Sequence, residues 1–170
     1  MQEVRRGGRI LDRMSLLKPR RKTRSVRVGN LVLGSDHPIR VQTMTKGDTA
    51  DVYKTFDEIV GLEATGCELV RLSVPSMKQA LALGEIKRRV SIPVVADIHF
   101  SAPLALEAIA QGVDKVRINP GNIGRRDEVE KVVRAAKDKG VAIRIGVNSG
   151  SIRERKGLSV KADEEDMVEL

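Results

Sequence analysis

The chain has 170 residues, of which 41% are hydrophobic, so it can bury the core of one ordinary domain. No apolar run approaches the roughly 18 residues that a membrane span needs, and the N-terminus lacks the continuous apolar segment of a secretory signal. The single cysteine, Cys67, excludes an internal disulfide and fits a reducing compartment. We therefore expect a cytoplasmic protein with no membrane partner.

The formal net charge of +8 is concentrated in the N-terminal tail. Residues 1–27 contain ten Lys or Arg and two acidic residues, which leaves 21 basic and 21 acidic residues in the remainder. Because the body is neutral, no nucleic-acid partner is expected, and an anion bound there must meet a local cluster of arginines. Residues 1–24 are predicted to form a flexible basic tail, with a nucleic-acid or targeting arm as the alternative.

After the tail, the sequence predicts a hairpin and then a regular alternation of strand and helix. Apolar residues alternate around Gly29-Asn30 in residues 26–34, which is typical of a β-hairpin. Five strands are predicted near residues 39–45, 68–74, 93–100, 114–120 and 142–148. Apolar residues at helical spacing predict helices near 51–65, 76–89, 101–112 and 126–139, and residues 163–170 resemble the start of another.

Several residues indicate where these helices begin and end. Ser76 and Ser101 are expected to cap two of them, and Pro103 suits the first turn of the second. Gly112 and Gly140 are expected to end the two later helices.

The alternation of strand and helix predicts βα units around a parallel sheet. An open doubly wound sheet and an eight-stranded barrel, which needs about 250 residues, both fit this pattern. Five units fit in the chain, and it stops inside a helix-like segment. We therefore predict that residues 25–170 form the N-terminal five βα units of a truncated TIM-type α/β barrel.

Polar residues interrupt the predicted strands near their C-terminal ends, always at a spacing of two. The pairs that share a strand face are Arg71 with Ser73, Asp97 with His99, Arg117 with Asn119, and Arg144 with Asn148. The intervening residues are predicted to face the helices: Val70, Leu72, Ile98, Val116, Ile118, Ile143, Ile145 and Val147. The polar sets should meet at the C-terminal edge of the sheet, where ligands bind in parallel α/β folds.

Three arginines at this edge, with Asp97 as the only obvious acid, would repel one another without a bound anion. Guanidinium groups bind phosphate through two hydrogen bonds at once, so we predict a polyanionic ligand, most simply one with two phosphates. The backbone N–H groups of residues 121–124 are expected to face a phosphate. An internal salt-bridge network is the alternative reading of the same residues.

Asp97 and His99 are predicted to hydrogen-bond hydroxyl groups or relay protons rather than bind a metal. Only His37 and His99 are histidines, and three arginines near a metal site would repel the cation. Cys67 lies in an apolar context and is expected to be a small core residue.

Five segments, in this order and spacing, resemble a known family: VQTMTKGDTADV, CELVRLSVP, IPVVADIHF, GVDKVRINPGNIG and IRIGVNSGS. They are similar to the N-terminal barrel of the 4-hydroxy-3-methylbut-2-enyl diphosphate synthase family, over about Arg21 to Ser151. The resemblance implies a pteroate-synthase-like barrel, followed by a smaller domain that holds a 4Fe-4S cluster. It also implies reductive dehydration of 2-C-methyl-D-erythritol 2,4-cyclodiphosphate in the non-mevalonate isoprenoid pathway. The implied electron donor is flavodoxin or ferredoxin, and the implied assembly is a homodimer.

The resemblance also assigns roles to residues of this chain. Arg71, Arg117 and Arg144 match positions that hold the diphosphate, and Asn148 matches a position near it. We add Asn119 to this substrate-binding set because it shares a strand face with Arg117. Asp97 and His99 match positions around the substrate hydroxyls and are the expected catalytic pair.

The family's cluster uses three cysteines and a glutamate from a C-terminal region, and Cys67 is not one of those positions. We therefore expect this polypeptide alone to hold no metal and to be inactive. Two other functions stay open. One is a cluster-free phosphate- or pterin-binding barrel synthase, and the other is a nucleic-acid-binding protein that uses the basic tail.

Overall fold

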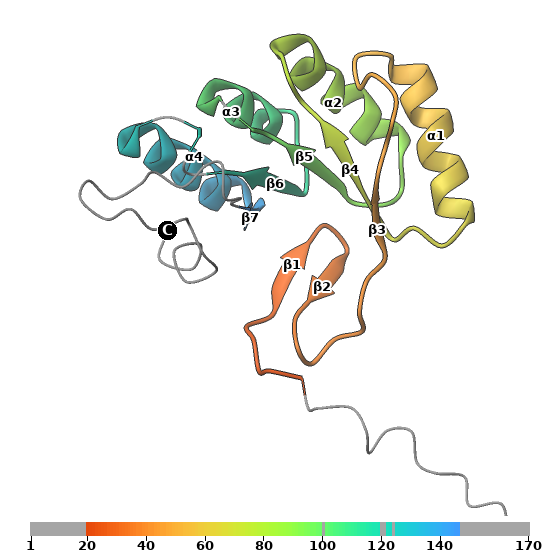
Figure 1. Cartoon of the computed structure of the whole chain (residues 1–170), viewed down its shortest axis with the longest axis horizontal. Helices are drawn as coiled ribbons and strands as arrows, with labels where there is room; N and C mark the ends of the chain where they lie inside the picture. Colours follow the sequence, from red (N-terminus) through yellow and green to blue (C-terminus); the bar gives the residue numbers. More distant parts are fainter. Residues whose placement is uncertain (1–19, 100, 120–121, 124, 147–170) are drawn as a thin grey trace, which may run out of the picture.

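A computed structural model of the chain describes residues 20–99, 101–119, 122–123 and 125–146 (Figure 1). The strands are β1 (Val26–Val28), β2 (Leu31–Leu33), β3 (Gln42–Met44), β4 (Leu69–Ser73), β5 (Val94–Asp97), β6 (Lys115–Ile118) and β7 (Ala142–Ile145). The helices are α1 (Val52–Ala64), α2 (Met77–Arg89), α3 (Ala102–Ala110) and α4 (Arg126–Lys139). The predicted order of hairpin, five strands and four helices is confirmed, although the strands are shorter than predicted. The helix start predicted over 163–170 lies outside the described residues.

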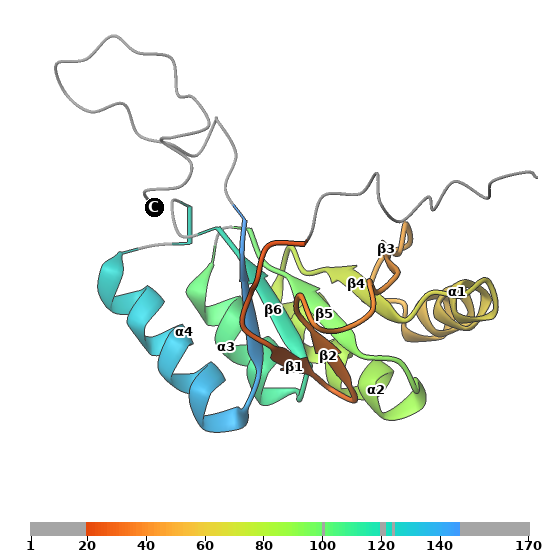
Figure 2. The same ribbon diagram turned by 90° about the horizontal axis from the view of Figure 1, so that it is seen from below.

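The five later strands form one sheet in the order β3-β4-β5-β6-β7, and every neighbouring pair is parallel. The four helices lie in a row along one face of this sheet (Figures 1 and 2). A doubly wound sheet has helices on both faces, whereas a barrel has them all on the outside. The one-sided row therefore decides between the two predicted architectures in favour of the barrel type.

Apolar residues of the strands pack against the helix row. Val70, Leu72, Ile98, Val116 and Ile118 are at most 2% exposed and belong to one core cluster with buried residues of all four helices. This confirms the predicted alternation for β4 to β6, because every second strand residue faces the helices.

Ile145 lies beside Ile118 in the sheet and so shares its helix-facing side, as predicted, but it is 63% exposed. β7 is the last strand of the described sheet, and no described helix follows it to cover this position. Val147 lies outside the described residues.

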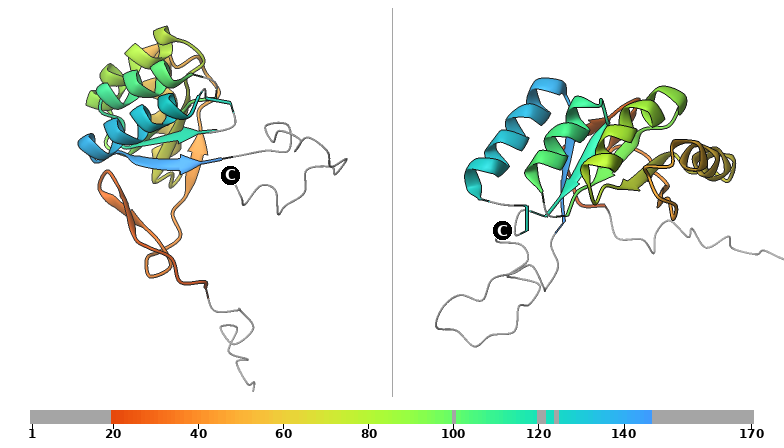
Figure 3. Two further views of the ribbon diagram at one scale, coloured as in Figure 1. Left: turned by 90° about the vertical axis from the view of Figure 1, so that its left-hand side faces the viewer. Right: turned by 90° about the horizontal axis from the view of Figure 1, so that it is seen from above.

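The predicted hairpin pairs β1 with β2 and lies on the side of the sheet away from the helices (Figure 3). Its Val28 is fully buried in a second, smaller apolar cluster with Leu69, Val95 and Ala142, which face away from the helices. Gly29 turns the chain with φ +58°, and a Cβ there would lie 2.8 Å from the Asp114 carboxylate. The hairpin thus closes the inner face of the sheet near the strand beginnings.

The helix ends follow the sequence in part. Gly112 and Gly140 have φ angles of +84° and +66°, and α4 ends at Gly140 as predicted. Ser76 and Ser101 occupy the N-cap positions, but neither side chain makes the expected bond to the helix backbone. The Ser76 hydroxyl instead donates to the Gln79 side-chain oxygen at 2.5 Å, so it accepts no hydrogen bond from the first turn of α2.

Residues at the end of the predicted tail contact the loop after the hairpin. The Arg20 guanidinium donates to the carbonyl oxygens of Gly34 and His37 at 3.0 and 2.8 Å. Thr23 and Ser35 exchange hydrogen bonds between backbone N–H and side-chain oxygen. Residues 1–19, most of the basic tail, lie outside the described residues. Of the helices that the structure describes, none is long and apolar enough to cross a membrane.

Candidate anion-binding site

The strand register places the inward-facing residues of β4 to β7 in two lateral rows. The row nearer the strand beginnings contains Arg71, Val95, Lys115 and Ala142, and the next row contains Ser73, Asp97, Arg117 and Arg144. Lateral neighbours in a sheet point to the same side, and these alternate with the residues that pack on the helices. Both rows therefore face the side of the sheet that becomes the inside of a barrel.

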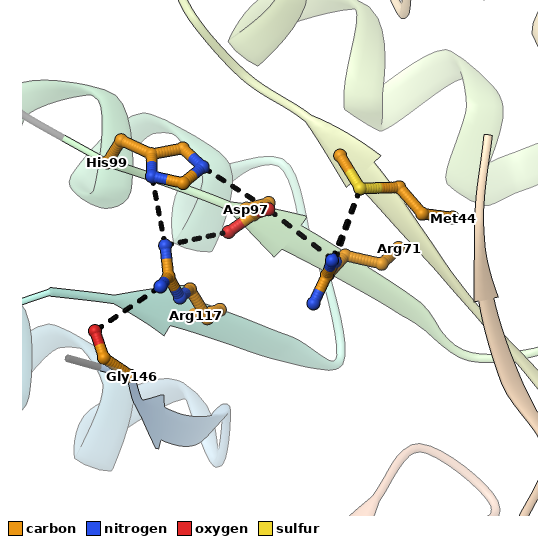
Figure 4. Close-up of polar contacts among 6 residues, drawn as sticks. All are labelled: Met44, Arg71, Asp97, His99, Arg117 and Gly146. Carbon is orange, nitrogen blue, oxygen red and sulfur yellow. Dashed lines mark hydrogen bonds and ion pairs between the residues drawn. The ribbon is translucent and has the colours of Figure 1, made fainter. Parts of the chain in front are cut away.

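Asp97 is the shared acid of this face (Figure 4). Its side chain is 4% exposed, and its two oxygens lie 3.5 Å from Arg71 Nε and 3.5 Å from Arg117 Nη1. Tight ion pairs of this kind have N–O distances of about 2.7–2.9 Å. The carboxylate is thus shared loosely between the two arginines and saturates neither guanidinium group.

His99 bridges Asp97 and Arg117 at the end of β5. Its Nε2 lies 3.4 Å from Asp97 Oδ2, and its Nδ1 lies 3.0 Å from Arg117 Nη1. A guanidinium only donates, so Nδ1 must accept and the ring hydrogen must be on Nε2, toward Asp97. This arrangement fits a neutral imidazole whose orientation is set by both neighbours.

Arg117 is the most enclosed of the three predicted arginines, with a side chain 14% exposed. Its Nη2 donates to the Gly146 carbonyl oxygen at 3.3 Å. A Cβ at Gly146 would lie 2.7 Å from Arg117 Nε, so the guanidinium packs on the backbone just after β7 and would have to move if this residue had a side chain. Gly146 is a site residue that the sequence analysis did not select, because a glycine offers no side chain to mark a polar face.

Arg71 and Arg144 are bound less firmly. Nε and Nη2 of Arg71 each lie 3.4 Å from the Met44 sulfur, which is a weak acceptor. Arg144 is exposed, and within the described residues it forms no ion pair. The structure therefore brings Arg71, Asp97, His99 and Arg117 into one contact cluster and places Arg144 beside it in the same row.

Lys115 belongs to the same face and was missed by the sequence analysis. It is 7% exposed and lies two residues before Arg117 on β6. Burial, together with the positive charges of Arg144 and Arg71, lowers the pKa of its ammonium group. The signal was present in the sequence, because the alternation of Arg117 and Asn119 continues back to Lys115.

The loop after β6 differs from its prediction. The backbone N–H groups of Asn122 and Ile123 both donate to the Asn119 carbonyl oxygen at 3.0 Å, so the turn uses them and they do not face a ligand. Gly121 and Gly124 lie outside the described residues, as does Asn148. The Asn119 side chain is buried at the end of β6, on the face that Arg117 shares.

The inner face carries more positive than negative charge. Arg71, Lys115, Arg117 and Arg144 stand against one carboxylate, Asp97, among the described residues of the two rows. Enclosed like charges raise the free energy of the fold unless a counter-ion neutralises them. An anion with several oxygens, such as a phosphate ester, would accept hydrogen bonds from this face and neutralise it.

The described residues do not fit a metal centre. No three His, Cys, Asp or Glu side chains gather in the part of the chain that the structure describes. The Cys67 thiol is buried and lies 3.1 Å from the Leu69 carbonyl oxygen, as suits a core residue. An iron–sulfur cluster needs about four such ligands, so these residues alone cannot hold one.

The fold and the site define a class: a TIM-type barrel segment with a cationic inner face at the C-terminal ends of its strands. Dihydropteroate synthase from Xanthomonas albilineans, solved in complex with indole-2-carboxylic acid and 6-chloroguanine, has a similar fold. The TM-score is 0.52 at 15% sequence identity, over 70% of this chain and 48% of that chain. At this identity the likeness concerns the fold alone.

The chain belongs to the GcpE TIM-barrel domain family, whose sequence model matches residues 23–170. It is 51% identical over 137 residues to a protein of Caldanaerobacter subterraneus subsp. tengcongensis, and 55% identical over 142 residues to one of Geobacillus thermodenitrificans. Both relatives are named 4-hydroxy-3-methylbut-2-en-1-yl diphosphate synthase (flavodoxin). The matches cover 81% and 84% of this chain but only 39% and 38% of the relatives.

Proposed function

We propose that this chain is the substrate-binding part of an enzyme that converts 2-C-methyl-D-erythritol 2,4-cyclodiphosphate to 4-hydroxy-3-methylbut-2-enyl diphosphate by reductive dehydration. The observation behind this is the cationic inner face around Arg71, Arg117 and Arg144 in a chain of this family. Both relatives are named as synthases of a diphosphate. The oxygens of a substrate with two phosphates would accept hydrogen bonds from these arginines and neutralise their charge.

In this proposal the arginines hold and orient the two phosphates. Arg117 is anchored by Gly146 and Asp97, so its remaining N–H groups are positioned before the substrate arrives. Preorganised donors bind an anion without the cost of ordering flexible side chains. Asn119 and Asn148 complete the substrate-binding set.

The catalytic part of the proposal assigns Asp97 and His99 to the substrate hydroxyls. His99 is half-exposed, with its orientation set by Asp97 on one nitrogen and Arg117 on the other. An imidazole held in this way can donate or accept a hydrogen bond at a fixed place beside the bound phosphates. These roles have their support in the contact geometry and in the motif VADIHF.

The proposal extends to the complete enzyme. Its 4Fe-4S cluster would supply the electrons, and its ligands would come from outside the described residues. The relatives' name includes flavodoxin, which supports flavodoxin as the electron donor, with ferredoxin as the other candidate. The same proposal includes a homodimer and a cytoplasmic location. It divides the chain into a basic tail over 1–24 and a barrel portion over 25–170, and it places the cluster in a separate domain.

The identities of 51% and 55% to named synthases favour this function over a cluster-free pterin-binding synthase or a nucleic-acid-binding protein. The likeness to dihydropteroate synthase, at 15% identity, supports the barrel and no reaction.

The test uses a graft, in which the matched 142 residues of this chain replace the corresponding segment of the Geobacillus thermodenitrificans relative. With a reductant, this grafted enzyme should consume the cyclodiphosphate and release the linear diphosphate. Arg117→Ala should weaken substrate binding by roughly 1.5–3 kcal/mol, the value of a hydrogen bond to a charged group. The control is Arg89→Ala, at the C-terminal end of α2 and far from the site, where Arg89 pairs with Glu85.

Calorimetric titration measures the binding, and product analysis measures the reaction. Unchanged binding in Arg117→Ala would remove Arg117 from the site. A folded graft without turnover of the cyclodiphosphate would refute the proposed reaction.

A further inference from the structure

Lys115 is an enclosed cation for which the proposed function names no role. It is 7% exposed and points to the inner face of β6, with Val95 and Ala142 as its lateral neighbours in the sheet. The adjacent acid, Asp114, pairs with Lys87 at 2.6 Å and accepts a hydrogen bond from the Val94 backbone N–H at 2.7 Å. Within the described residues, Lys115 forms no ion pair or hydrogen bond with any acid.

The surroundings of Lys115 make its charge unfavourable in the absence of an anion. Arg71 lies in the same lateral row, and Arg144 lies one step further along β7. Their positive charges add to the effect of burial and lower the pKa of the ammonium group. Asp97 already contacts Arg71, Arg117 and His99, so it does not neutralise this corner of the face.

We infer that Lys115 is a further substrate-binding residue, which donates to the same phosphates as Arg71 and Arg144 and extends the site one row deeper into the barrel. This inference rests on the proposed function. The competing reading is an ion pair with one carboxylate from outside the described residues. A single carboxylate would neutralise Lys115 but leave Arg144 without an acid, whereas a diphosphate has enough oxygens for both.

The two readings predict opposite effects of removing the charge. If Lys115 binds substrate, Lys115→Met relieves repulsion in the ligand-free protein and weakens binding of the anion. If Lys115 is half of a buried ion pair, the same change leaves a carboxylate unpaired, so the protein becomes less stable. Anion binding would then have no reason to change.

The experiment titrates the grafted enzyme and its Lys115→Met variant with inorganic diphosphate by calorimetry and records melting temperatures without ligand. Lys139→Met is the matched control, because Lys139 is exposed in the last turn of α4. We expect the dissociation constant to rise about tenfold or more in Lys115→Met, as for loss of a charged hydrogen bond. The melting temperature should stay the same or rise, and Lys139→Met should match the wild type.

A dissociation constant within about twofold of the wild-type value overturns the inference, whatever the melting temperature. Lys115→Gln, which removes the charge but keeps a hydrogen-bond donor, is titrated alongside in case the methionine variant does not fold. Inorganic diphosphate needs no electrons and no turnover. Failure of the proposed reaction would therefore leave this comparison decisive for Lys115.

Discussion

Asp97 is the one carboxylate that the basic groups of the inner face share among the described residues. It lies within 3.5 Å of basic groups of Arg71, His99 and Arg117, yet none of these contacts has the length of a tight ion pair. A carboxylate divided in this way keeps the basic groups together without saturating them. The cluster can therefore bind an incoming anion without first breaking a strong internal bond.

At the same scale, Gly146 provides the space that Arg117 occupies. Gly146→Ala would place a Cβ 2.7 Å from Arg117 Nε, so the guanidinium must move. Because a flexible side chain gives way more easily than backbone, we expect little loss of stability. Diphosphate binding by the grafted enzyme should weaken by about 1 kcal/mol, roughly fivefold, on calorimetric titration.

Gly61→Ala is the control for the Gly146 variant, since a Cβ at Gly61 would meet nothing within 4 Å. Equal diphosphate affinity in Gly146→Ala and wild type would show that the guanidinium position seen here does not matter for binding.

At the scale of elements, the residues of each strand alternate between the helix-facing side and the inner side of the sheet. In β6, Val116 and Ile118 pack against the helices, while Lys115 and Arg117 face inward. The parallel order of β4, β5, β6 and β7 then aligns the inward residues laterally. The hairpin covers the beginnings of these strands, so the polar face is left at their C-terminal ends.

The hairpin depends on Gly29 for both its turn and its contact with the sheet. Gly29→Ala forces a φ of +58° on a residue with a side chain and brings its Cβ to 2.8 Å from Asp114. We expect a loss of roughly 1–3 kcal/mol in the free energy of unfolding, measured by urea unfolding of the grafted enzyme.

Gly61→Ala serves as the opposite control for the hairpin, because Gly61 lies within α1 and has no positive φ. Alanine there should stabilise the protein by about 0.5–1 kcal/mol. A Gly29→Ala variant as stable as wild type would show that the turn at Gly29 and its contact with Asp114 do not contribute to the stability of the fold.

At the scale of the whole molecule, the described part is an unclosed arc with β3 and β7 at its edges. Ile39 and Ile145, which flank these edges, are 81% and 63% exposed. Open strand edges leave backbone N–H and C=O groups unpaired, and a closed barrel has no such edges. This agrees with the match to less than two-fifths of the length of the relatives.

The metal chemistry also belongs to this scale. Reconstitution of the 170-residue chain with iron and sulfide should give no cluster absorbance band, because Cys67 is its single thiol and is buried. The grafted enzyme, treated identically, is the positive control and should develop the band. A band in the 170-residue chain would show that this expectation is wrong.

The sequence by itself determined the order of strands and helices, the hairpin, the helix-facing positions of β4 to β6 and the identity of the polar face. These features depend on local periodicity, which the chain carries in its residue pattern. Arg71, Asp97 and Arg117 could be selected in this way because each breaks the alternation of its own strand.

The tertiary structure alone decided which of these residues touch. Register between strands sets Lys115 in the same lateral row as Arg71 and near Arg144, and it brings Gly146 next to Arg117. It also showed that the turn consumes the N–H groups of Asn122 and Ile123, and that Ile145 is left uncovered. Apart from the local turn at Asn119, these facts depend on contacts between segments far apart in the chain, and no local pattern encodes them.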